Sequence, residues 1–190
     1  MLFQPSLDPI EIVTFWFSPE VKPLWFEKNR EFDEVISRRF GNFYEELVKS
    51  LRSESWNNFC EGPEEVLPFI ITLDQFPRNM FRDTPKAFAT DDLALSLSKS
   101  ISRKGFDMTL PSPDHYNFLY MPFMHSESLE DQEEGLRLFS AISENDETVA
   151  YSKWHRDIIE KFGRFPHRNK ILGRSSTVEE QEYLKEFKGF

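Results

Sequence analysis

The sequence has a single cysteine, Cys60, among its 190 residues. One thiol cannot form a disulfide within the chain, which excludes a small disulfide-stapled scaffold and fits a reducing compartment. Glycine is also scarce, at seven residues, and this disfavours a turn-rich β-sandwich or a glycine-rich nucleotide-binding fold. A chain of this length buries roughly 70% of its unfolded surface, so it can fold on a hydrophobic core alone.

An export signal and a long apolar run are missing as well. Residues 1–5 lack both the basic region and the apolar core of a signal peptide. No stretch approaches the ~20 apolar residues that a membrane-spanning helix needs. The net charge of −10 argues against general affinity for nucleic acids or anionic membranes. We therefore expect a cytoplasmic protein with neither nucleic acid nor membrane as a partner.

Basic residues are outnumbered overall but concentrated in one segment. Residues 126–147 carry eight acidic residues and one basic residue, whereas residues 153–174 carry seven basic and two acidic residues. The acidic half is typical of a solvated helix face. The basic half is less ordinary, because its arginines are interleaved with aromatic residues, histidines and a proline.

Aromatic residues are abundant, and many recur at helical spacing. The chain has twenty phenylalanines, four tryptophans and five tyrosines. Phe32, Ile36, Phe40 and Leu47 form one apolar stripe, which predicts a long helix over about 31–51. Further stripes and short polar connections follow, and only residues 13–17 could form a strand. We expect one domain, residues 1–190, with an all-α fold of antiparallel helix pairs in a tetratricopeptide-like array.

Capping residues and prolines predict several helix ends. The Asp8-Pro9 step is typical of a helix start. Pro122 should kink or end the helix that begins near Asp114, close to His125. Residues 176–179, Ser-Thr-Val-Glu, predict a capping box for the last helix.

The helix over about 148–162 is predicted to bury one stripe. That stripe contains Tyr151, either Trp154 or His155, and Ile158. His155 would then lie about two turns before the basic segment.

A central buried helix is predicted over about 63–75, where almost no polar face remains. Asp74 shares a face with Leu67 and Ile71, so its carboxylate needs a partner. Arg78, four positions later, is the expected partner.

Two Phe-Pro steps each deliver an arginine and an asparagine just after an apolar run. They are residues 76–79, Phe-Pro-Arg-Asn, and residues 164–169, Arg-Phe-Pro-His-Arg-Asn. Proline fixes the direction of the chain, and arginine suits bidentate binding of carboxylate or phosphate. We predict one polar site between helix ends; the alternative is that these arginines cap helices and pair with Asp74, Glu127 or Asp157. The candidate ligand-binding residues are Asp74, Arg78, Asn79, His125, Glu127, His155, Arg164, His167, Arg168 and Asn169.

Two histidines offer acid–base chemistry. His125 follows Pro122 at the edge of the predicted core, and His155 lies on the stripe of the 148–162 helix. Either could act on an anionic substrate without a metal, or could be a hydrogen-bonded core histidine. The Cys partners of a zinc deaminase, the His-Glu-x-x-His zinc motif, the nucleophile elbow and the dinucleotide fingerprint are all absent. A metal site is therefore poorly supported, and the sequence leaves any cofactor unknown.

The motifs together resemble those of a known family. They are residues 74–79, 120–127 and 163–169, with 13–17, 25–26 and 172–180 at the two ends of the chain. This set is similar to the bacterial domain-of-unknown-function family 924 over nearly the whole chain, with local departures at Phe123 and Lys170. The resemblance implies an all-helical, tetratricopeptide-like fold and brings no activity, cofactor or catalytic residue.

Three functions remain open from the sequence. The first is a binding module that holds an anionic small molecule or peptide in the Arg/His/Asn site. The second is a metal-independent enzyme that uses His125 or His155 as its acid–base group. The third is a structural or interaction protein whose polar cluster only locks the fold.

Overall fold

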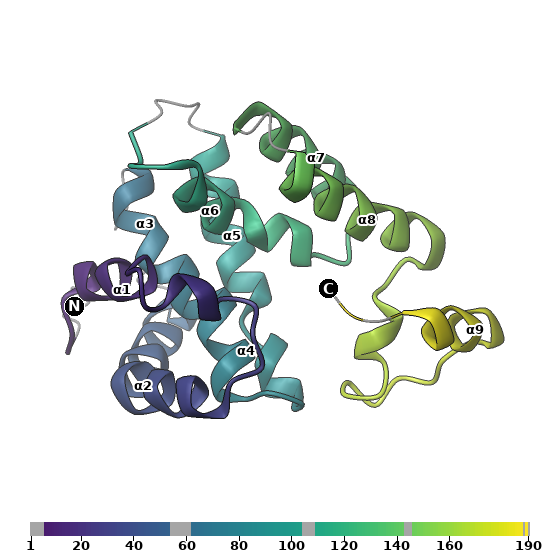
Figure 1. Cartoon of the computed structure of the whole chain (residues 1–190), viewed down its shortest axis with the longest axis horizontal. Coiled ribbons are helices and arrows are strands. Elements are labelled where there is room, and N and C mark those ends of the chain that lie inside the picture. The colour runs from purple at the N-terminus through teal and green to yellow at the C-terminus, as the bar shows by residue number, and fades with distance from the viewer. Residues whose placement is uncertain (1–5, 54–61, 104–108, 143–145, 188, 190) are drawn as a thin grey trace.

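The fold is all-α, as the sequence predicts (Figure 1). The computed structural model describes residues 6–53, 62–103, 109–142, 146–187 and 189, and no strand occurs among them; Cys60 lies outside these residues. The α-helices are α1 Pro9–Trp16, α2 Arg30–Arg52, α3 Pro63–Ile70, α4 Phe76–Met80, α5 Asp91–Ser102, α6 Pro113–His125, α7 Leu129–Ile142, α8 Asp146–Phe162 and α9 Val178–Glu186. The shorter elements are η1 Lys22–Leu24, η2 Ile71–Gln75 (a π-helical turn), η3 Pro85–Phe88 and η4 Pro166–Arg168. None of the described helices is both long and apolar enough to cross a membrane.

The N-terminal helices begin where their capping residues predict. The Asp8 carboxylate accepts a hydrogen bond from the Ile10 backbone N–H (3.0 Å), and Asn29 caps α2 by accepting from Phe32 N–H (3.0 Å). These bonds satisfy backbone donors that have no partner within the helix. The predicted stripe of α2 is buried in the main core.

Two hydrophobic clusters hold the chain together. The main cluster joins α1 to α7 and is rich in aromatic rings. A small second cluster, built on Ile158, Ile159 and Phe165, attaches the C-terminal segment to α8. In Figure 1 α7 and α8 lie side by side, and the yellow C-terminal segment with α9 lies beyond them. The helix pairing is compatible with a tetratricopeptide-like array, which stays a prediction.

The first Phe-Pro step is helical, and this corrects the prediction that the helix ends before it. The helix of α3 continues through the wider turn η2 into α4, which contains Pro77. Proline has no N–H for the carbonyl four residues earlier, and its ring crowds that carbonyl. Here that carbonyl, Leu73 O, accepts the Thr90 hydroxyl instead (2.6 Å). A π turn and a side-chain donor therefore carry the helix past its proline.

Two details near the C-terminus also differ from prediction. On α8 the buried stripe contains His155 and Ile158, whereas Tyr151 and Trp154 are exposed. The buried face of α8 is therefore turned away from Tyr151 and Trp154 and toward the small second cluster, which gathers around Phe165. The capping box of α9 lies one residue later than predicted and joins Thr177 to Glu180. That shift matters for the polar residues of the second Phe-Pro step, because Glu180 is also their partner.

Candidate functional site

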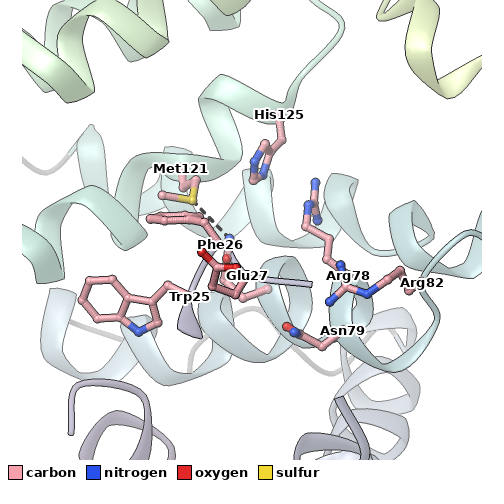
Figure 2. A pocket seen from close by; sticks show the side chains of 9 residues that line it. Trp25, Phe26, Glu27, Arg78, Asn79, Arg82, Met121 and His125 are labelled. Carbon is pink, nitrogen blue, oxygen red and sulfur yellow. Dashed lines mark hydrogen bonds between the residues drawn. The ribbon is translucent and has the colours of Figure 1, made fainter. Parts of the chain in front are cut away.

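A pocket of about 130 Å³ opens between α4, α6 and the connection that precedes α2. One side is apolar and aromatic, and the other is polar. Figure 2 shows His125 reaching down from α6, with the rings of Trp25 and Phe26 on one side and the two arginines on the other. The lining residues are Trp25, Phe26, Glu27, Gln75, Arg78, Asn79, Arg82, Met121 and His125.

A carboxylate–histidine pair lies at the inner wall of this pocket. The Asp74 side chain is fully buried, and its Oδ1 lies 2.7 Å from His125 Nδ1. A carboxylate only accepts hydrogen bonds, so Nδ1 carries the hydrogen. No described residue bonds to the other ring nitrogen, Nε2, and Nε2 is not among the buried atoms that lack a partner. This nitrogen is therefore open to the pocket as an acceptor.

The local charges keep Asp74 ionised and His125 neutral. Burial alone would raise the pKa of Asp74, but Arg78 and His125 outweigh it and hold that pKa well below its usual range. Burial, helped by the Arg78 charge, lowers the pKa of His125 against the opposing effect of Asp74. At neutral pH the pair is a carboxylate bonded to a neutral imidazole, which is the arrangement of a general base.

Both pocket arginines are paired, but neither has all its donors in use. Arg78 forms two bonds to Asp91 (2.9 and 3.0 Å) and also contacts Asp74 as predicted. Arg82 forms two bonds to Asp33 through Nε and Nη2 (2.8 and 2.7 Å). The described residues give no acceptor to Arg82 Nη1 or to Arg78 Nε, so N–H groups remain for a ligand.

Asn79 lines the pocket and shares its acidic partner, Asp33, with Arg82. Its amide donates to Asp33 Oδ1 (2.8 Å). Gln75 donates to Asp74 Oδ2 (2.5 Å) and to the Met121 sulfur (3.2 Å). These bonds fix the polar floor before any ligand arrives.

Arg168 reaches the back of this cluster from the C-terminal segment. It is 7% exposed and lies between the rings of Phe88 and Phe165, at 4.8 and 4.5 Å. Its Nη1 donates to the His125 carbonyl (3.1 Å). Burial lowers the pKa of Arg168 to about 10, which leaves it charged. Arg168 supports His125 and does not line the pocket.

The other predicted residues of the second Phe-Pro step form a separate network. Arg164 binds both oxygens of the buried Glu180 (2.6 and 2.8 Å), and Asn169 donates to the same carboxylate (3.2 Å). Glu127 pairs with Arg174 (2.7 and 3.0 Å). The prediction of one site from both steps is thus only partly right, because this network fastens the C-terminal segment and leaves the pocket to the first step.

The two other histidines predicted for the site pack against the aromatic residues of the second cluster. His155 Nδ1 lies 2.8 Å from the Tyr151 carbonyl, and burial lowers the pKa of His155 to about 3. His167 stacks on Phe187 at 5.1 Å, and burial lowers its pKa to about 4. Neither ring lines the pocket.

Comparison with known proteins places the chain in a family. A family model described as bacterial protein of unknown function (DUF924) matches residues 12–188. The chain belongs to the DUF924 family. This DUF924 chain is also similar to a solved protein of unknown function, ATU0120 from Agrobacterium tumefaciens, with 37% identity and a TM-score of 0.82 over 94% of this chain and 97% of that one. No functionally curated protein matches. The resemblance expected from the motifs is confirmed, and the function has to be argued from the pocket.

Most residues that line the pocket of this DUF924 protein were not predicted from the sequence, and neither were the two acids behind it that pair with its arginines. Asp91 reads as a helix-capping residue and Asp33 as part of a solvated helix face, yet they neutralise Arg78 and Arg82. The sequence indicates these two acids only through the general rule that a paired arginine requires an acidic partner. Within the described part of the chain, no group of three His, Cys, Asp or Glu residues is placed to hold a metal ion.

Proposed function

We propose that the pocket is the active site of an acid–base enzyme in which His125 is the general base. The observation that carries this proposal is the Asp74–His125 hydrogen bond of 2.7 Å at the wall of an open pocket. Asp74 fixes the imidazole with Nε2 as acceptor, and the lowered pKa keeps that nitrogen unprotonated at neutral pH. A histidine that only filled the core would have no need of an open Nε2.

The pocket offers a group for the proton and a group for the charge of the proposed step. A bound molecule gives its proton to His125 Nε2, and the imidazolium so formed is paired with the Asp74 carboxylate. The negative charge left on the molecule then meets the spare N–H groups of Arg78 and Arg82. Donors that are already fixed stabilise such a developing charge without reorganising.

The predicted anionic ligand is replaced here by a ligand that becomes negatively charged when it gives its proton to His125. Asp33, Asp74, Asp91 and the exposed Glu27 offset the arginines around the pocket. The site is therefore not strongly positive, and a single acidic or hydrogen-bonding group suits it better than a phosphate. The volume of about 130 Å³ is well below the ~300 Å³ of common ligand pockets, so a peptide could insert only one side chain.

The reactivity of the histidines tests this proposal. Diethyl pyrocarbonate modifies an unprotonated, accessible imidazole nitrogen, so His125 should react faster than His155 and His167 at neutral pH. Peptide mass spectrometry after short exposures measures the three rates in one sample. Equal rates for His125 and the buried His155 would contradict an open Nε2.

Turnover supplies the second test. We expect the wild-type protein to consume at least one compound of a small-metabolite mixture, and His125→Gln to consume none of it. Asp74→Asn should lose most of that activity, while Val178→Ala, at an exposed position on α9, should keep it. Loss of stability in the first two variants without any turnover would favour a purely structural cluster.

A further inference from the structure

The apolar side of the pocket is a rigid aromatic wall. Trp25 is anchored by its indole N–H, which donates to the Trp16 carbonyl (2.8 Å). Its ring also meets Phe118 edge-on, with 4.7 Å between centroids and 76° between planes. A side chain held by a hydrogen bond and by ring packing presents its surface to a ligand at little entropic cost.

Phe26 extends this wall to the mouth of the pocket. The side chain is 73% exposed, although it is large and apolar, and it lies parallel to Phe118 (6.3 Å, 15°). Single exposed apolar residues are ordinary on protein surfaces. This one lines a pocket beside Trp25 and Met121, where its face can stack on a bound ring (Figure 2).

The size of the pocket limits what the wall can contact. A volume of about 130 Å³ is close to the ~150 Å³ of an engineered cavity that binds benzene. The pocket therefore has room for one ring with a small substituent, and not for the whole of a dinucleotide or a fused-ring cofactor.

The polar side requires a donor and an acceptor on the same ligand. His125 Nε2 can only accept at neutral pH, so the ligand must present an N–H or O–H to it. Arg78 and Arg82 can only donate, so the ligand must also present an oxygen or an unprotonated nitrogen. A carboxylate at neutral pH supplies the second group and lacks the first.

We propose that the pocket binds a planar, single-ring aromatic or heteroaromatic molecule that carries a neighbouring hydrogen-bond donor and acceptor. The ring stacks against Trp25 and Phe26, and the polar edge lies between His125 and the arginines. This proposal specifies the ligand class for the proposed function. It rests on that function in one respect, the neutral state of His125.

Three matched probes test the ligand class by NMR titration of the full-length protein at pH 7.5. Benzamide has a planar ring, an N–H donor and a carbonyl acceptor; cyclohexanecarboxamide keeps the polar group and loses planarity; benzoate keeps the ring and loses the donor. We expect benzamide to bind about two- to tenfold more tightly than cyclohexanecarboxamide, the range that an aromatic contact contributes. We expect a similar advantage, about two- to tenfold, over benzoate, which lacks the hydrogen-bond donor to His125 Nε2. Equal or weaker binding of benzamide, or no binding of any probe at its solubility limit, overturns the proposal.

Variants of Phe26 locate the stacking contact. Because this side chain is exposed, Phe26→Ala and Phe26→Leu should leave the fold intact. Both should remove most of the advantage of benzamide over cyclohexanecarboxamide, whereas Ile10→Ala, another exposed apolar position, should preserve it. An undiminished advantage in Phe26→Ala overturns the stacking role.

The result for His125→Gln separates this proposal from the proposed function. Suppose that the variant binds benzamide as tightly as the wild type, still prefers it to cyclohexanecarboxamide, and that His125 is unreactive to diethyl pyrocarbonate. The general-base function and the hydrogen bond to His125 then fail, while the stacking of a planar ring on the aromatic wall stands. If His125 is reactive but cyclohexanecarboxamide binds as well as benzamide, the ring proposal fails while the general base stands.

Discussion

Glu180 illustrates how a single buried charge can hold a segment of the chain. The carboxylate is 2% exposed and accepts from Arg164, from Asn169 and from the Thr177 backbone N–H (2.7 Å). The bonds to Arg164 lower the pKa of Glu180 to about 2, despite the opposing effect of burial. One carboxylate thus accepts hydrogen bonds both from the start of α9 and from the second Phe-Pro step.

Neutralising this carboxylate should weaken the C-terminal segment. We expect Glu180→Gln to lower the free energy of unfolding by about 2 kcal/mol, because hydrogen bonds to a charged group are lost or weakened. Urea unfolding followed by circular dichroism measures the change. Glu160→Gln is the matched control, since Glu160 pairs with Arg156 in an exposed position on α8 and should cost under about 0.5 kcal/mol. Similar losses in the two variants would contradict the role of Glu180.

At this scale the sequence predicts the right partner only where it is near. Arg78 was expected to meet Asp74 four residues away, and it does. Arg164 and Asn169 looked like ligand-binding groups because they flank the second Phe-Pro step within a basic segment. Their acid lies 16 and 11 residues later and is brought to them by the fold of the C-terminal segment.

The π turn between α3 and α4 is the element that positions the pocket floor. It sets Asp74 and Gln75 toward α6 and carries the chain through Pro77 to Arg78. Proline predicts a helix end by its own chemistry. The sequence could not show that Thr90, 17 residues after Leu73, supplies the replacement donor.

Removing that donor should destabilise the π turn. Thr90→Val keeps the shape of the side chain but leaves Leu73 O without its 2.6 Å hydrogen bond. We expect a loss of about 1–2 kcal/mol in the free energy of unfolding, together with shifted NMR signals for the pocket residue Gln75. Thr84→Val removes a similar hydroxyl bond, to Phe81 O (2.7 Å), at an exposed position and should change stability by under about 0.5 kcal/mol. No difference between the two variants would show that the Thr90 bond is dispensable.

Over the whole molecule, the uneven charge seen in the sequence is partly neutralised within the fold. The beginning of the acidic segment lies against the end of the basic one, as the pairing of Glu127 with Arg174 shows. Arg164 and Arg168 of the basic segment also pair with acids, Glu180 and Asp91, so these side chains are not free to bind polyanions. His155 lies within the basic segment, on the inner side of α8, and is buried and uncharged.

Burial of His155 should make the stability of the folded protein depend on pH. In the unfolded chain a histidine has a pKa of about 6.5, whereas burial lowers the pKa of His155 in the folded protein to about 3. Below pH 6.5 the unfolded chain therefore takes up a proton that the folded protein does not. The stabilising contribution is complete above that pH and is lost as the pH falls toward 3, by up to about 1.4 kcal/mol per pH unit.

Urea unfolding at pH 7.0, 6.0 and 5.0 isolates this contribution when wild type and His155→Gln are compared. The variant is expected to be less stable at pH 7.0, because it loses packing and the bond to Tyr151 O. Its free energy of unfolding should nevertheless fall less steeply than that of the wild type as the pH is lowered. The two slopes should differ by up to about 1.4 kcal/mol per pH unit. Lys153→Gln, at an exposed position on the same helix, should keep the wild-type slope. Parallel slopes for wild type and His155→Gln would mean that His155 takes up its proton in the folded protein as well, so that its burial could not cause the loss of stability in acid.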